Sequence, residues 1–407
     1  MQFHAFWPYF LLVAAVVGMA ALPVFRFIDT APNADARYAT IDGLRGFLAL
    51  SVFVFHLVVT QEFIETGRWE LPTARLYALL GPIGVSLFFM ITGFLFWGKL
   101  LRAKGRPRWY ELYIGRLFRI GPLYLFVVLV MLYIVFARTG FELQEPASAV
   151  ISSALQWLAL GVLNTQPDVN GYPATHVLAG VTWTITYEWG FYASLMLTAY
   201  FARGRAHLFF VLVAILVCLA EKSLLDNEIL GITALFVAGM LVASLVHEKL
   251  IPPLSKSVSS ALALACLVFI FSTSHNGYGT LTMIVLTLFF YLVCTGASLF
   301  GLLTSMPARR LGNISYSLYL MQGLVLTLIY SIPSIRSFAL ESAFNYWVVG
   351  FVCAGALVLA ASVGYAFIER PGIALGKRII QRRAGPRPAI EAEMTICRRS
   401  SLPHRKI

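Results

Sequence analysis

The stretch TIDGLRGFLALSVFVFHLVVT, Thr40–Thr60, decides the fold, because it is apolar enough to span a bilayer and yet carries Asp42, Arg45 and His56. An ionisable side chain inside a span costs roughly 2.5–3.5 kcal/mol on insertion scales, so such residues mark candidate sites. Arg45 and His56 are eleven residues apart. At about 100° per residue, both side chains lie on one helix face, roughly 16 Å apart along the axis. The alternative is that Arg45 anchors the helix at the membrane surface and His56 only packs.

The composition is that of a multi-pass membrane protein. The chain has 407 residues, of which 59% are hydrophobic and only 12% are charged, far outside the range of soluble domains. Its net charge of +12 does not indicate a nucleic-acid partner, because the cations lie in short loops and in the C-terminal tail. The five cysteines are scattered without metal-ligand spacing, and no metal is expected.

Apolar segments of about 17–25 residues, the length that crosses a bilayer, predict an all-α fold. Eleven candidates occur, near residues 6–25, 43–60, 79–98, 117–136, 181–201, 207–221, 229–247, 258–273, 281–301, 311–332 and 345–368. Ser148–Leu163 is shorter and more polar. We interpret it as an interfacial or re-entrant helix.

The loop charges predict the orientation and the domain limits. Lys and Arg collect in alternate loops, which places the N-terminus outside and the C-terminus in the cytoplasm. Arg45 then lies at the cytoplasmic surface, and His56 lies about one turn short of the outer surface. Residues 1–39 are predicted to form an N-terminal span and a cytoplasmic linker, and residues 40–371 the main membrane domain. Residues 372–407 form a basic cytoplasmic tail, expected to be disordered and to lie against anionic lipid.

Two further clusters concern packing and phosphate contacts. Gly84 and Gly93 lie in one span, where glycines let helices approach closely. In RLFRIGPLY, residues 116–124, Arg116 and Arg119 share a helix face at the cytoplasmic end of a span. Arginine is suited to bidentate phosphate contacts, so these two could hold a phosphorylated ligand. Topology anchoring explains them equally well.

Glu188 is the third candidate, in TWTITYEWGFY, residues 182–192. It follows the predicted outer surface by about seven residues, roughly 10 Å in depth. His56 is predicted at a comparable depth on a helix that runs the opposite way. A Glu188–His56 pair would fix the imidazole tautomer and raise its basicity, the arrangement of a general base.

Six ordered motifs resemble the acyltransferase 3 family of integral membrane acyltransferases. They are IDGLRG followed by FVFHL, GVSLFFMITGFL, RLFRIGPLY, TWTITYEWGFY, LGNISYSLYL and IERP, and they extend from Ile41 to Pro371. The resemblance implies a core of ten spans, so residues 6–25 would add an extra N-terminal helix. One departure is Gln322, where many members have histidine.

The resemblance implies an enzyme of the bacterial inner membrane that is an O-acyltransferase. Acyl-CoA, commonly acetyl-CoA, is the expected donor, and the acceptor is a hydroxyl of an extracytoplasmic glycan or lipid-linked glycan. Arg45, Arg116 and Arg119 would then bind the CoA phosphates. His56, oriented by Glu188, would deprotonate the acceptor. In a variant of this reaction, the acyl group first passes to a side chain of the protein, such as a tyrosine, and forms a covalent intermediate.

The sequence leaves two alternative functions open. The first keeps the scaffold and acylates a secreted small molecule, with the acceptor pocket among residues 139–180, which include Asp168, Asn170, Tyr172 and His176. The second is a transporter or lipid flippase, in which the ionisable residues line a path through the membrane. The ionisable residues cluster in the first half and no internal repeat is visible, which favours the enzyme.

Overall fold

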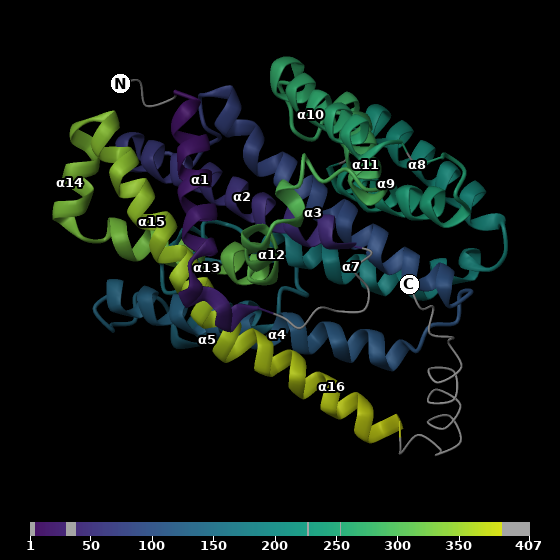
Figure 1. Cartoon of the computed structure of the whole chain (residues 1–407). Coiled ribbons are helices and arrows are strands. Elements are labelled where there is room, and N and C mark those ends of the chain that lie inside the picture. Colours follow the sequence, from purple (N-terminus) through teal and green to yellow (C-terminus); the bar gives the residue numbers. More distant parts are fainter. Residues whose placement is uncertain (1–4, 30–37, 226–227, 253, 385–407) are drawn as a thin grey trace.

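A computed structural model of the chain describes residues 5–29, 38–225, 228–252 and 254–384. The architecture is all-α, as predicted (Figure 1). The helices are α1 (Trp7–Ala21), η1 (Pro23–Ile28), α2 (Ala39–Thr66), α3 (Arg75–Arg102), α4 (Trp109–Arg138), α5 (Ala147–Leu158), α6 (Ala174–Val177), α7 (Trp183–Thr198), η3 (Ala199–Ala202), α8 (Ala206–Leu225), α9 (Glu228–Glu248), α10 (Lys256–Thr273), α11 (Thr280–Cys294), η4 (Leu302–Thr304), α12 (Met306–Asn313), α13 (Ser315–Tyr330), α14 (Pro333–Glu341), α15 (Ala343–Gly364), η5 (Tyr365–Glu369) and α16 (Arg370–Ala384).

Each of the eleven predicted spans coincides with a helix, but several are shortened by breaks. Within the described residues, six helices are long and apolar enough to cross a membrane, and the α13–α14 pair, bent by 92°, makes a seventh if it is one broken span. Helix α11 ends at Cys294 because the chain turns there through Gly296, Leu299, Phe300 and Gly301, which have positive φ. Helix α5 has 12 residues, too few to cross a bilayer.

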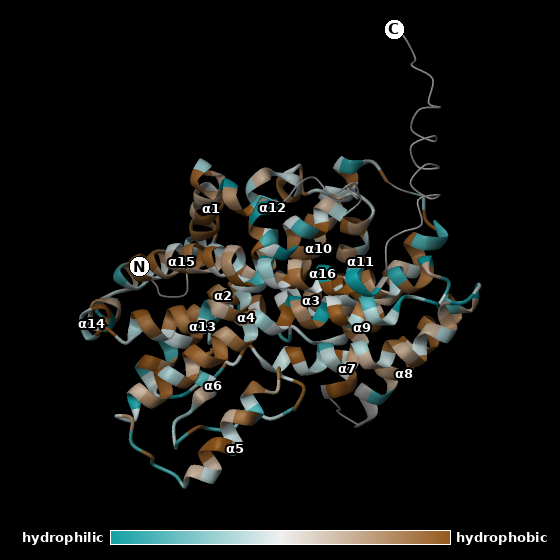
Figure 2. Ribbon diagram, turned by 90° about the horizontal axis from the view of Figure 1, so that it is seen from below, coloured by the Kyte–Doolittle hydropathy of each residue, from teal (hydrophilic) through white to brown (hydrophobic). Residues whose placement is uncertain are grey.

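The outer surface of the helix bundle is apolar. Leu197, Phe209 and Phe367 are 78%, 74% and 76% exposed. In Figure 2 hydrophobic residues cover much of the helices, whereas hydrophilic residues gather mostly near helix ends and in loops. Large apolar side chains exposed in this way suit contact with lipid tails. The chain is therefore a multi-pass membrane protein.

Glycines bring helices α3 and α9 into backbone contact. A Cβ atom on Gly93 would lie 2.1 Å from the Phe236 carbonyl oxygen, and one on Gly239 would lie 2.0 Å from that of Met90. Gly84 packs against Val52 of α2 in the same way, at 2.7 Å. The predicted role of Gly84 and Gly93 in close packing is confirmed.

Helices α2 and α13 pack side by side and run parallel. At the start of α2, helix α12, which directly precedes α13, makes the contact. A Cβ atom on Gly46 would lie 2.6 Å from the Cβ atom of Leu311 in α12, and one on Gly312 of α12 would lie 1.9 Å from the Asp42 carbonyl oxygen. Further along, Thr60 of α2 and Thr327 of α13 line one cavity. The chain thus contacts the start of α2 just before α13 begins and reaches the level of Thr60 near the end of α13, so the two helices run in the same direction.

The N-terminal helix α1 is fastened to this pair through Arg310 of α12. The Arg310 side chain is 1% exposed. It donates from Nε to Asp29 Oδ1 at 2.7 Å and from Nη2 to Oδ2 at 3.0 Å, and from Nη1 to the carbonyl oxygens of Ala20 and Leu22 at 2.8 and 3.0 Å. It thus caps the C-terminal end of α1. The predicted cytoplasmic linker lies mainly at residues 30–37, outside the described residues.

The chain between α6 and α7 descends into the bundle beside α13. Thr327 Oγ1 donates to the Val177 carbonyl oxygen at 3.1 Å, and Tyr319 Oη donates to that of Val181 at 3.0 Å. Between these two contacts, Gly323 lies directly against the backbone of Leu178. Helix α7 therefore begins in the interior of the protein.

Part of the predicted disordered tail is helical. Helix α16 continues α15 through the π-helical turn η5 and packs along α4 (Figure 1). Gly372 and Gly376 allow this contact, with Pro122 and Phe118 against them. The prediction of disorder is wrong for residues 372–384, because these glycines and the apolar face of α16 have a partner in α4. Residues 385–407 lie outside the described part.

Candidate functional site

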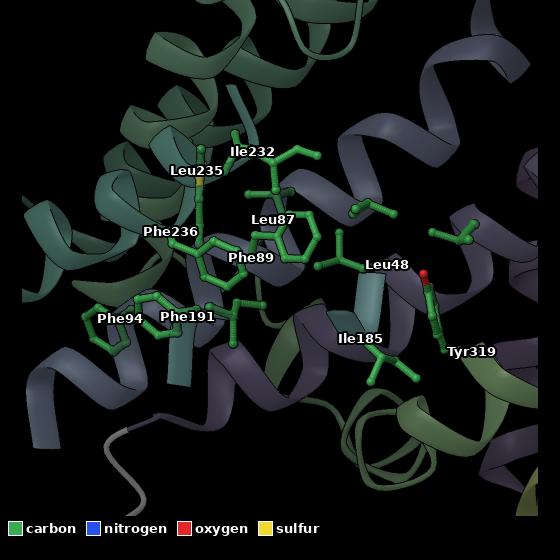
Figure 3. Packing of buried hydrophobic residues seen from close by; sticks show 14 of the residues in the cluster. Leu48, Leu87, Phe89, Phe94, Ile185, Phe191, Ile232, Leu235, Phe236 and Tyr319 are labelled. Atoms are coloured by element: carbon green, nitrogen blue, oxygen red, sulfur yellow. The ribbon is translucent and has the colours of Figure 1, made fainter. Parts of the chain in front are cut away.

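Four of the five predicted site residues, namely Arg45, Arg116, Arg119 and Glu188, line one cavity. The cavity has a volume of about 210 Å³ and lies among α2, α3, α4, α7 and α13. Arg45 comes from α2, and Arg116 and Arg119 come from α4. We call it the arginine cavity. Its apolar wall includes Phe89, which lies beside Phe236 in Figure 3, with 4.6 Å between the ring centroids.

The arginines are held by aromatic and acidic neighbours. The Arg116 guanidinium lies 4.4 Å from the centroid of the Phe96 ring, within the range of a cation–π contact. Arg119 Nη2 lies 3.8 Å from Glu369 Oε1. Glu369 is 0% exposed and accepts a 2.8 Å hydrogen bond from Ser317 Oγ. This buried carboxylate thus partly balances the positive charge of Arg119 at the wall of the cavity.

Glu369 was not predicted as a site residue. Its position before a proline in IERP is also explained by an ordinary helix end. The only signal in the sequence was its place in one of the six motifs. Its burial depends on η5, which turns the chain so that Glu369 points inward between α13 and α4.

The predicted Glu188–His56 pair is wrong. Glu188 Oε2 accepts a 2.6 Å hydrogen bond from Tyr192 Oη, and the carboxylate lies in the arginine cavity. The depth estimate placed Glu188 near the outer end, on the assumption that α7 starts at the surface. Because the preceding segment already descends beside α13, Glu188 lies deeper and reaches the level of Arg45 and Arg116.

The His56 ring is half-buried and has a defined tautomer. Nδ1 lies 3.0 Å from the Val52 carbonyl oxygen. A carbonyl oxygen only accepts, so Nδ1 carries the proton and Nε2 of the neutral ring is left as the acceptor. The ring also interacts with the Gln322 side chain of α13. Gln322 Nε2 donates to the Tyr319 carbonyl oxygen at 2.8 Å, and Gln322 Oε1 is buried without a hydrogen-bond partner.

A second cavity lies one turn beyond His56, where α2 contributes Thr60 and Phe63. It has a volume of about 460 Å³, and we call it the His176 cavity. Tyr172 and His176, which the sequence placed in an acceptor pocket, line it. Asn170 instead is fully buried and ties the loop together, donating to Thr139 Oγ1 and to the Glu142 carbonyl oxygen at 2.8 Å.

The two cavities and His56 lie in order along the parallel helices α2 and α13. Along α2, Arg45 lines the arginine cavity, His56 follows about three turns later, and Thr60 lines the His176 cavity one turn beyond His56. On α13, Tyr319 borders the first cavity, and Leu326 borders the second. The predicted common face of Arg45 and His56 agrees with this order.

The chain belongs to a family of acyltransferases. The model of that family, described as an acyltransferase domain, matches residues 38–367, which confirms the resemblance found in the motifs. The match and the apolar helices together place the chain among the multi-pass membrane proteins of this acyltransferase family.

Among curated proteins, the acyltransferase MdmB of Streptomyces mycarofaciens is 30% identical over 175 residues, which cover 41% of this chain and 40% of that relative. The chain therefore aligns with less than half of the relative's length. No solved structure matches the chain significantly.

Proposed function

We propose that this protein is an O-acyltransferase of the bacterial inner membrane. It transfers an acyl group, in the first instance acetyl, from cytoplasmic acyl-CoA to a hydroxyl of an extracytoplasmic glycan or lipid-linked glycan. The observation that carries the proposal is the convergence of Arg45, Arg116 and Arg119 on one cavity, with His56 about three turns further along α2.

The arginine cavity is proposed to bind the phosphates of the donor. Guanidinium groups form short, charge-assisted hydrogen bonds to phosphate oxygens. Glu369 and Glu188 keep the three cations folded into the protein when no donor is bound. The distance of roughly 16 Å between Arg45 and His56 along the helix suits a pantetheine arm that extends from the phosphates to the imidazole.

His56 is proposed as the general base. Its Nε2 takes the proton of the acceptor hydroxyl while the hydroxyl oxygen attacks the thioester carbonyl carbon. The carbon–sulfur bond then breaks, and the departing CoA thiolate takes the proton from the His56 imidazolium, which gives the free thiol and an acyl ester and restores the neutral imidazole. The Gln322 Oε1 atom accepts a hydrogen bond from the imidazolium that forms between these steps. The tautomer, which Glu188 was predicted to fix, is set by the Val52 carbonyl oxygen.

Direct transfer is proposed over a covalent tyrosine intermediate. Tyr316 Oη donates to the Ile120 carbonyl oxygen at 2.9 Å and Tyr319 Oη to that of Val181 at 3.0 Å, and a backbone carbonyl cannot act as a general base. Tyr192 Oη donates to Glu188 at 2.6 Å, but a carboxylate is a far weaker base than a tyrosinate. None of these three hydroxyls therefore has the imidazole-type activation that suits a nucleophile.

The test is thiol release from acetyl-CoA by the purified full-length chain in lipid nanodiscs, with cell-envelope glycan as acceptor and mass spectrometry of the product. Native protein is expected to release thiol only with the acceptor present and to form an acetyl ester. His56→Ala abolishes release, whereas His275→Ala, which removes an exposed loop imidazole, leaves it unchanged. Release without an acetylated product, or equal release by His56→Ala, would contradict the proposal.

A further inference from the structure

The His176 cavity combines an aromatic platform with two cations. Trp69 and His176 stack with 4.9 Å between ring centroids and an interplanar angle of 14°, and Phe63 meets the edge of this pair at 5.1 Å. Arg138 from the end of α4 and Arg336 from α14 line the same cavity. Sugar rings bind proteins through flat aromatic faces beside hydrogen-bonding groups.

No carboxylate is found beside Arg138 and Arg336 among the described residues that line the His176 cavity. None of the described lining residues is acidic. Carboxylates at the same end of the protein are engaged elsewhere: Glu62 accepts from Thr73 Oγ1 at 3.1 Å and Glu65 accepts from Gln61 Nε2 at 2.7 Å. Burial lowers the pKa of His176, although nearby Asp168 opposes this. The imidazole is therefore mainly neutral at pH 7, and the charge of the cavity comes from the two arginines.

Arg138 is held in position for a ligand. Its Nη2 donates to Ser331 Oγ, and Ser331 Oγ in turn donates to the Thr327 carbonyl oxygen. Thr327 and Ser331 both line the cavity. The guanidinium is thus attached to the wall of the cavity at one nitrogen, and its other donors remain for an anion.

We propose that the His176 cavity is the acceptor subsite and that it selects acceptors in which a hydroxyl-bearing ring carries an oxyanion, either a carboxylate or a phosphate. The ring lies on the Trp69 face, and the oxyanion binds Arg138 and Arg336. The acceptor role rests on the acyl transfer proposed above, whereas recognition of the oxyanion does not. His56, one turn below Thr60, faces the hydroxyl side of the bound ring.

The test measures binding first, by titration calorimetry on the full-length chain in phosphatidylglycerol nanodiscs. The probes are p-nitrophenyl β-glucoside, its 6-carboxylate analogue p-nitrophenyl β-glucuronide, and the 6-phosphate of the glucoside. Both anionic probes are expected to bind at least tenfold more tightly than the neutral one. Arg138→Gln and Arg336→Gln each remove most of that difference. Arg68→Gln, an exposed outer arginine beside Trp69 that does not line the cavity, keeps it.

Three outcomes would overturn the inference. Equal affinity for neutral and anionic probes would exclude oxyanion recognition, as would unchanged selectivity in both cavity variants. Tight binding in micelles of a polyoxyethylene ether that is lost in phosphatidylglycerol nanodiscs would show that lipid phosphate occupies the arginines. By contrast, selective binding in nanodiscs without any thiol release from acetyl-CoA would contradict the proposed function and leave the oxyanion site intact.

Discussion

Gln322 of α13 interacts with the His56 ring of α2 across two parallel helices, and its Oε1 atom is buried without a hydrogen-bond partner. The imidazole proposed as the general base therefore has an uncharged amide beside it, and not a carboxylate. A proton taken up by Nε2 therefore leaves an imidazolium that is stabilised by an amide oxygen.

Gln322→Leu is expected to lower kcat about tenfold or more, because a hydrogen bond to a charged group contributes about 1.5–3 kcal/mol. The KM values for acetyl-CoA and acceptor stay unchanged, since Gln322 lines neither cavity. Met321→Leu is the matched control on the same helix. Steady-state kinetics in nanodiscs would contradict the account if Gln322→Leu raised KM and left kcat intact.

Arg116→Gln is expected to weaken acetyl-CoA binding by about tenfold to a hundredfold, because each charge-assisted contact to a phosphate is worth about 1.5–3 kcal/mol. Equilibrium binding of CoA measures this directly. Arg106→Gln, an exposed arginine in the loop before α4, is the control and keeps native affinity. Equal loss in both variants would point to a general charge effect in place of a phosphate site.

Glu188→Gln tests the corrected position of this residue. The amide oxygen still accepts from Tyr192, but the variant removes a negative charge from the arginine cavity. The KM for acetyl-CoA is expected to fall three- to tenfold, corresponding to about 1 kcal/mol of relieved repulsion. The value of kcat stays within about threefold. A loss of kcat as large as that of His56→Ala would restore the pairing of Glu188 with His56.

Asp29→Asn tests how α1 is attached. The hydrogen bond and charge of Arg310 hold the pKa of Asp29 below its usual range. The ion pair therefore stabilises the fold above about pH 4, the unfolded value, and the contribution is lost as pH falls through the lower folded value. Because the carboxylate is 43% exposed, the effect is below about 1 kcal/mol.

Thermal unfolding in nanodiscs between pH 6 and pH 3 is the measurement. The native Tm is expected to fall towards pH 3 more steeply than that of Asp29→Asn. Glu111→Gln removes a carboxylate paired with the largely exposed Arg108 and is expected to keep the native profile. Parallel curves for native protein and Asp29→Asn would show that the pair adds no stability.

Helix periodicity and hydropathy were sufficient to predict the features that depend on a single helix. Arg45 and His56 share a face because eleven residues make close to three whole turns. Gly84 lies at a close helix contact because a glycine within a span has no side chain to keep the neighbouring helix away. Neither inference requires knowledge of a second, distant segment of the chain.

The errors arose where backbone breaks or long-range contacts decide the structure. Glu188 lies deeper than predicted because an irregular segment, and not α7, passes through the outer part of the bundle. Glu369 is buried only because of the turn η5. Arg310 is one of the cations whose distribution predicts the orientation, yet its partner Asp29 is 281 residues away. None of these contacts can be read from the residues that neighbour Glu188, Glu369 or Arg310 in the sequence.

Reconstitution into sided vesicles tests whether the acyl group passes between the two ends of the α2–α13 pair. The chain is reconstituted into liposomes in a single orientation, with acetyl-CoA only on the side of the C-terminal tail and the glycan acceptor only on the other side. Acetyl ester is expected on the separated acceptor, with thiol released on the donor side, and neither product is expected with His56→Ala. Acetylation only when donor and acceptor share one side would contradict transfer between the two ends.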